Sequence, residues 1–157
     1  MNREDNPCIR VLKEKDIPLK DPDGRGKSIY RIINPERKEV TIHTIDGCLI
    51  QEGERCDYLV AVDESRKAFY VELKGHDLNK AMKQIIATFN CFKNQNKFNL
   101  QLGRIVPTKV NAPKNWRSSA DKLRVMFFDE NKKNGTLGRL RLIDMLDYKN
   151  NEYRDEI

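Results

Sequence analysis

Three residues near the middle of the chain, Asp57, Glu72 and Lys74, carry the side chains that metal-assisted hydrolysis requires. Asp57 opens an apolar run that extends to Val62, and Glu72 and Lys74 close a second run that starts at Ala68. Two carboxylates that converge on one point form a hard oxygen site of the kind that Mg²⁺ uses. An ammonium group beside them can hold a water molecule or stabilise developing negative charge.

The two apolar runs are joined by a short charged segment, residues 63–67, which predicts a tight turn and therefore a β-hairpin. Side chains alternate along a strand, so Glu72 and Lys74 share one face of the second strand, and Val71 and Leu73 take the other. The acids are therefore expected to come from neighbouring strands.

A change of periodicity follows the hairpin. Asp77 is a good helix N-cap, and apolar residues then recur at helical spacing from residue 78 to residue 92. This helix is expected to lie across the sheet that precedes it. It can also serve as the crossover to a strand parallel to the one that carries Glu72.

The remaining elements frame this unit. Strands are predicted at residues 28–33, 39–45, 48–50, 100–110, 123–128 and 137–146. The last is favoured as a strand running into a helical turn, with a short helix as the alternative. Residues 1–27 are predicted to be loop-like, with a short helix around Val11 that Pro18 stops, and the polar tail from Asp147 is expected to fray. The order indicates one domain over residues 1–157, of α/β or α+β class, with a mixed central sheet flanked by helices.

The bulk composition favours a polyanionic partner. Lys and Arg number 30 against 24 Asp and Glu, so the net charge is +6 and the pI about 9.1. Nucleic acid is the first candidate, and a generic cationic surface is the alternative. The chain opens without a signal-peptide pattern and contains no bilayer-spanning apolar run, so a cytoplasmic protein without a membrane partner is expected.

The four cysteines, Cys8, Cys48, Cys56 and Cys91, contain no Cys-x-x-Cys pair and are expected to be free thiols in a reducing compartment. A zinc site made of His43, Cys48 and Cys56 is conceivable, but the spacing fits no common finger or ribbon.

Asp57 followed by Glu72-Leu73-Lys74 at a strand end, and then by an amphipathic helix, resembles the PD-(D/E)XK nuclease superfamily. This group includes restriction-endonuclease-like and Holliday-junction-resolvase-like folds. The resemblance covers residues 48–92. It implies a restriction-endonuclease-like fold and a Mg²⁺-dependent endonuclease that hydrolyses phosphodiester bonds, with DNA as the favoured substrate, RNA as the alternative and Mn²⁺ as a substitute metal.

The same resemblance assigns roles to individual residues. Asp57 and Glu72 correspond to the acidic metal ligands, and the backbone carbonyl of Leu73 to a third oxygen ligand. Lys74 corresponds to the residue that holds or polarises the attacking water, and Gln84 to a helix glutamine that approaches the site. Cys56 stands where many members have proline.

Further acids and cations have weaker cases. Many superfamily members carry an additional glutamate on an N-terminal helix, for which Glu14 is the candidate here. Asp46 is another possible acid, but an Asp-Gly turn is the favoured interpretation. Candidate contacts to nucleic acid are Lys83, His76, Lys114 and Arg117. The alternative for each cation is a solvated surface position, and for His76 a loop histidine near a helix start.

A chain of 157 residues encloses little of a duplex, so a homodimer is expected. Two other classes remain open. The same fold without turnover could bind nucleic acid or a protein partner, and a structural interaction domain would bind no metal.

Overall fold

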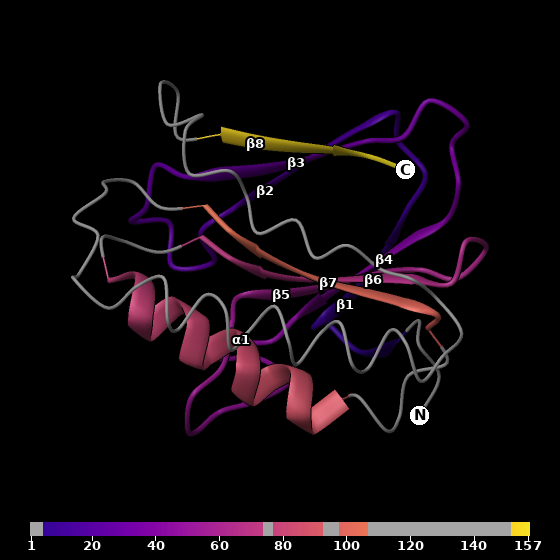
Figure 1. Cartoon of the computed structure of the whole chain (residues 1–157). Coiled ribbons are helices and arrows are strands. Elements are labelled where there is room, and N and C mark those ends of the chain that lie inside the picture. Colours follow the sequence, from indigo (N-terminus) through magenta and orange to yellow (C-terminus); the bar gives the residue numbers. More distant parts are fainter. Residues whose placement is uncertain (1–4, 74–76, 93–97, 107–151) are drawn as a thin grey trace.

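The computed structural model describes residues 5–73, 77–92, 98–106 and 152–157, and they form three layers (Figure 1). The middle layer is a five-stranded sheet in the order β1 (Ile9–Leu12), β4 (Val40–Thr44), β5 (Tyr58–Val62), β6 (Lys67–Glu72) and β7 (Leu100–Ile105). Helix α1 (Leu78–Phe92) covers one face of this sheet. The other face is covered by a smaller sheet in the order β2 (Asp16–Lys20), β3 (Ile29–Ile33) and β8 (Glu152–Glu156).

The predicted hairpin and crossover are confirmed. Strands β5 and β6 are antiparallel, with Tyr58 opposite Val71 and Val62 opposite Lys67. Strand β7 then lies parallel to β6, and α1 connects the two along the chain. Each residue of β5 is buried, because this strand has neighbours in the sheet on both sides and a packed layer on each face.

Two apolar cores separate the layers. The core between the sheets contains Val71 and Leu73, whereas the core beneath α1 contains Leu59 and Tyr70. The ring of Tyr70 meets that of Phe89 on α1 edge to face, with centroids 5.5 Å apart. The predicted alternation along the second strand is therefore confirmed for Val71 and Leu73, and it directs the face that carries Tyr70 toward the helix.

The N-terminal prediction is wrong, because residues expected to form a loop and a short helix form β1 and β2. Strand β2 lies at an edge of the three-stranded sheet, where a proline is tolerated. Pro18 is exposed there, while Ile17 and Leu19 on either side are buried in the core between the sheets.

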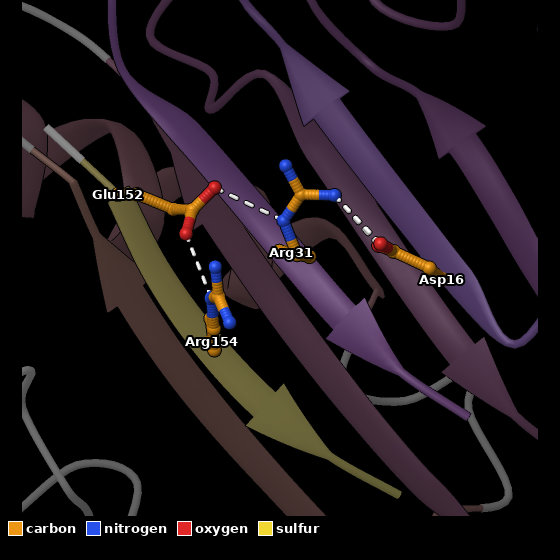
Figure 2. A network of polar contacts seen from close by, with 4 residues as sticks. All are labelled: Asp16, Arg31, Glu152 and Arg154. Atoms are coloured by element: carbon orange, nitrogen blue, oxygen red, sulfur yellow. Dashed lines mark hydrogen bonds and ion pairs between the residues drawn. The ribbon is translucent and has the colours of Figure 1, made fainter. Parts of the chain in front are cut away.

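The expectation of a frayed tail is also wrong for its last residues, which form β8 parallel to β3. Figure 2 shows how ion pairs cross this sheet: the Arg31 guanidinium binds Asp16 at 2.7 Å and Glu152 at 3.0 Å. On the inner side, buried Arg104 of β7 binds Asp155 at 2.6 Å, and the Tyr30 hydroxyl donates to the same carboxylate. These contacts hold the tail within the smaller sheet and against the five-stranded sheet.

The general α+β class is confirmed, since the described residues form two mixed sheets and a helix. In the part of the chain that the structure describes, a second sheet takes the face where a further helix was expected. Residues 48–50 form no strand; Ile50 makes a single bridge with Asp46 that closes a tight loop. The strands predicted at 123–128 and 137–146, and residues 107–110 of the strand predicted at 100–110, lie outside the described residues.

The cysteine prediction is wrong for one pair. Cys8 and Cys48 form a disulfide, while Cys56 and Cys91 are free thiols, the former buried and the latter exposed. A disulfide sulfur cannot serve as a thiolate ligand, which also removes Cys48 from the conceivable zinc set. Over the described parts of the chain, no helix is both long enough and apolar enough to cross a bilayer.

Candidate metal site

Asp57 and Glu72 lie opposite one another on the hairpin. Asp57 directly precedes β5 and Glu72 ends β6, so continuing the pairing of Tyr58 with Val71 by one residue sets Asp57 against Glu72. Residues directly opposite in an antiparallel pair point to the same face of the sheet. By alternation from Leu59 and Tyr70, this face is the one beneath α1.

Backbone hydrogen bonds fix the positions of both acids. The Asp57 carbonyl accepts the N–H of Ile45 at 2.9 Å, and the Glu72 carbonyl accepts the N–H of Val106 at 2.8 Å. The Asp57 carboxylate itself accepts the N–H of Leu73 at 2.8 Å through Oδ2. The Asp57 side chain is thus bonded to the backbone of the residue that follows Glu72. Each acid is held in position by hydrogen bonds to other segments of the chain as well as by its own strand.

The two carboxylates are removed from water. Asp57 is 4% exposed and Glu72 is 0% exposed. Burial disfavours the charged form of an acid, and two neighbouring acids disfavour it further. Two buried carboxylates therefore need either a nearby positive charge or a bound proton to offset their negative charge. One divalent cation would offset the charge of both.

The donor set fits magnesium. Its members are two carboxylates and the Leu73 carbonyl, all oxygens, and Mg²⁺ binds through one or two carboxylates while keeping several waters. Among the described residues, no group of three or more His, Cys, Asp and Glu side chains lies together in a way that could hold a metal. A site here would accordingly be completed by backbone and water oxygens, with no third acidic side chain from the described residues.

Thr88 connects the helix to the site. The backbone N–H of Cys56, directly before Asp57, donates to Thr88 Oγ1 at 2.8 Å, and the Thr88 hydroxyl donates to the Gln84 carbonyl at 3.0 Å. Gln84 is buried and lies one turn before Thr88 on α1. The helix face that carries Gln84 and Thr88 is therefore held against the start of β5.

Cys56 reports the charge of both acids. Burial is the main cause that raises the pKa of its thiol above the usual value, and the negative charges of Glu72 and Asp57 raise it further. A hydrogen bond with Thr88 acts in the opposite direction and lowers this pKa. The thiol therefore stays protonated and neutral, and it acts as a small apolar group in the core beneath α1.

The structure describes only some of the other residues that were predicted to act at the site or to contact nucleic acid. Lys83 is exposed on α1, whereas Lys74, His76, Lys114 and Arg117 lie outside the described residues. The Asp46 carboxylate binds the Arg55 guanidinium at 2.5 Å, which fits the turn interpretation of this residue. Glu14 is exposed between β1 and β2, at the opposite end of the sheets from Asp57.

Sequence reasoning missed Thr88 and the role of Tyr58. Thr88 is a fully buried hydroxyl in an otherwise apolar helix stripe, four residues after Gln84, and that combination is a detectable signal. Tyr58 follows Asp57, and its hydroxyl donates to the Lys20 carbonyl in the smaller sheet. No signal in the sequence identifies that long-range partner.

Comparison of the chain with protein-family models, with curated proteins and with solved structures gives no match.

Proposed function

We propose that this protein is a Mg²⁺-dependent nuclease that hydrolyses phosphodiester bonds in DNA, with Asp57 and Glu72 as metal ligands. The observation that supports the proposal most strongly is the buried pairing of these two acids across the hairpin, with Asp57 bonded to Leu73. The basic composition supports a nucleic-acid substrate.

The proposed roles rest on the chemistry of each group and, for Asp57 and Glu72, on their positions in the hairpin. A bound divalent ion lowers the pKa of a water molecule and offsets the charge that builds on a phosphoryl oxygen. Asp57 and Glu72 bind the ion, and the Leu73 N–H keeps the Asp57 carboxylate turned toward the end of β6. Lys74, the next residue along the chain, holds the attacking water without ligating the metal, because an ammonium has no lone pair.

Gln84 has a supporting role. Its backbone carbonyl accepts the Thr88 hydroxyl, and its position on α1 directs it to the sheet face that carries both acids. An amide can both donate and accept hydrogen bonds, so its side chain can orient a water or a phosphate oxygen without changing the net charge of the site. The hydrogen bond between Thr88 and the Cys56 N–H holds this part of α1, and with it Gln84, against the start of β5.

A cleavage assay with matched variants tests the proposal. Supercoiled plasmid and labelled duplex DNA are incubated with the protein in Mg²⁺, in Mn²⁺ and in EDTA. Glu72→Gln and Asp57→Asn are expected to abolish the metal-dependent cleavage shown by the wild type. Glu64→Gln makes the same change at an exposed acid in the β5–β6 turn and should cleave normally.

The outcomes separate the proposal from its alternatives. Cleavage that survives both site substitutions would come from a contaminant and would remove the enzyme assignment. Metal and DNA binding by the wild type without cleavage would indicate a catalytically inactive binding module. Calorimetric titration that detects no Mg²⁺ or Mn²⁺ binding would leave a domain without a metal site.

A further inference from the structure

The loop between β2 and β3, residues 21–28, lies at the same end of the molecule as the acid pair. Lys20 ends β2 and faces Ile29 at the start of β3. The hydroxyl of Tyr58 donates to the Lys20 carbonyl at 2.5 Å, and Tyr58 is the residue that follows Asp57. The loop is therefore anchored one residue away from the first proposed metal ligand, at the end where β6 finishes and α1 begins (Figure 1).

The shape of this loop is defined by local contacts. The Asp21 carbonyl accepts the N–H of Gly24 at 2.9 Å, and the Asp21 carboxylate accepts the N–H of Asp23 at 2.9 Å. Gly24 has φ +69°, and a Cβ at Gly26 would lie 2.6 Å from the Asp21 carboxylate. Glycine is therefore needed at Gly24 for its backbone conformation and at Gly26 for close approach, and the loop is set before any ligand arrives.

Cations at the end of β2 and in this loop are exposed to solvent. Lys20, Arg25 and Lys27 are exposed, while the Asp21 carboxylate is turned back onto the loop backbone. The acidic groups that face the same region are Asp21 and Asp23.

A further cation reaches this end from β1. Arg10 is exposed and lies opposite Ile42, on the sheet face that Tyr58 shares. It therefore adds a further cation at this end of the molecule, where Lys20, Arg25 and Lys27 outnumber Asp21 and Asp23.

We propose that Arg25 and Lys27, together with Lys20 and Arg10 at the same end of the molecule, bind the phosphodiester backbone of a nucleic acid and guide it to the Asp57–Glu72 pair. This inference rests on the proposed function and adds the surface that receives the substrate. Lys and Arg side chains that contact phosphates carry no sequence information but fix the register of the bound strand. The loop is suited to this role because it is preformed and lies at the end of the five-stranded sheet where the acid pair lies, on the side of the smaller sheet.

DNA binding measured without cleavage tests the loop. Fluorescence anisotropy of a labelled duplex is recorded in EDTA at several salt concentrations. The double variant Arg25→Gln/Lys27→Gln is expected to weaken binding several-fold and to reduce the slope of log K against log salt by about 2, since each phosphate contact contributes about 0.9.

The matched control removes two charges from the opposite end of the sheets. Lys13→Gln/Lys15→Gln changes exposed residues between β1 and β2, and its only described ion pair, Lys13 with Glu39, is a surface contact at 3.4 Å. This control should bind DNA like the wild type. Equal binding by the loop variant and the control would overturn the inference.

A parallel assay keeps this inference separate from the proposed function. If Glu72→Gln abolishes cleavage and the loop variant binds DNA normally, the nuclease assignment stands and the loop surface is rejected. If the loop variant loses DNA binding but the wild type never cleaves, the surface stands and the nuclease assignment fails.

Discussion

Thr88 on α1 accepts the backbone N–H of Cys56 at 2.8 Å, and this bond ties the helix to the residue directly before Asp57. The Thr88 hydroxyl donates its proton to the Gln84 carbonyl, so its oxygen is oriented to accept. Two proposed site residues, one on the hairpin and one on the helix, are thus held in position through one buried side chain.

Thr88→Val is expected to weaken both the fold and the site. Valine matches the shape of threonine but leaves the buried Cys56 N–H without its acceptor, which costs about 1–3 kcal/mol in unfolding free energy. Because the site loses its connection to α1, the Mn²⁺ affinity should also fall. Urea unfolding and metal titration measure the two effects.

Two further variants control this experiment. Thr88→Ser keeps the hydroxyl and should restore Mn²⁺ affinity close to the wild-type value. Thr41→Val makes the same change at another buried threonine, which lies opposite Ala61 at the far end of β5. If Thr41→Val weakens metal binding as much as Thr88→Val does, Thr88 has no specific role in positioning the site.

Divalent metal is expected to stabilise the fold. A ligand that binds only the native state adds about 2.7 kcal/mol when present at 100 times its Kd. The thermal midpoint of the wild type should therefore rise with Mg²⁺ or Mn²⁺, and that of Glu72→Gln should stay constant. The shift is read by differential scanning fluorimetry, with Glu64→Gln expected to follow the wild type. An equal rise for Glu72→Gln would place the binding elsewhere.

The disulfide between Cys8 and Cys48 should contribute strongly to stability. It closes a loop with a sequence separation of 40, for which chain entropy predicts a contribution of about 4 kcal/mol. Cys8→Ser/Cys48→Ser, or reduction of the wild type, should lower the urea midpoint accordingly. A midpoint that is unchanged by reductant, with four reactive thiols by titration in the unreduced unfolded protein, would contradict the pairing. The disulfide-bonded protein should instead show two, from Cys56 and Cys91.

Stability should decline in alkali through Tyr58. Its pKa is raised to about 12 by burial and then by Asp57, whereas the unfolded side chain ionises near pH 10. Between these values the unfolded state has lost a proton that the native state keeps, so the unfolding free energy falls as pH rises. Urea unfolding at pH 9 and at pH 11 should show that the unfolding free energy falls less between these two values for Tyr58→Phe than for the wild type. An identical loss in both proteins would exclude Tyr58 as a source.

Local patterns predicted the centre of this fold, and long-range partners decided the rest. The β5–β6 hairpin and α1 follow from alternation and helical periodicity within residues 57–92. Strand β2 was missed because Pro18 is compatible with a strand only at a sheet edge, and edge position is a property of the assembled sheet. Strand β8 was missed because its partner β3 lies more than a hundred residues earlier, and because Arg104 neutralises Asp155 only after folding.

The candidate site shows the same division. The facing of Asp57 and Glu72 follows from the hairpin register, which the sequence predicts through its short turn. Two hydrogen bonds could not be predicted from the spacing of residues in the sequence. The bond from the Leu73 N–H to Asp57 depends on the backbone conformation at the end of β6, and the bond from the Cys56 N–H to Thr88 depends on how α1 packs on the sheet. The disulfide likewise depends on β1 lying beside β4.

Anomalous diffraction from crystals soaked in Mn²⁺ tests the central claim most directly. The account predicts a manganese peak with carboxylate oxygens of both Asp57 and Glu72 about 2 Å away, and loss of that peak in Glu72→Gln. A peak elsewhere, or well-ordered Asp57 and Glu72 carboxylates with no metal between them at saturating Mn²⁺, would contradict it.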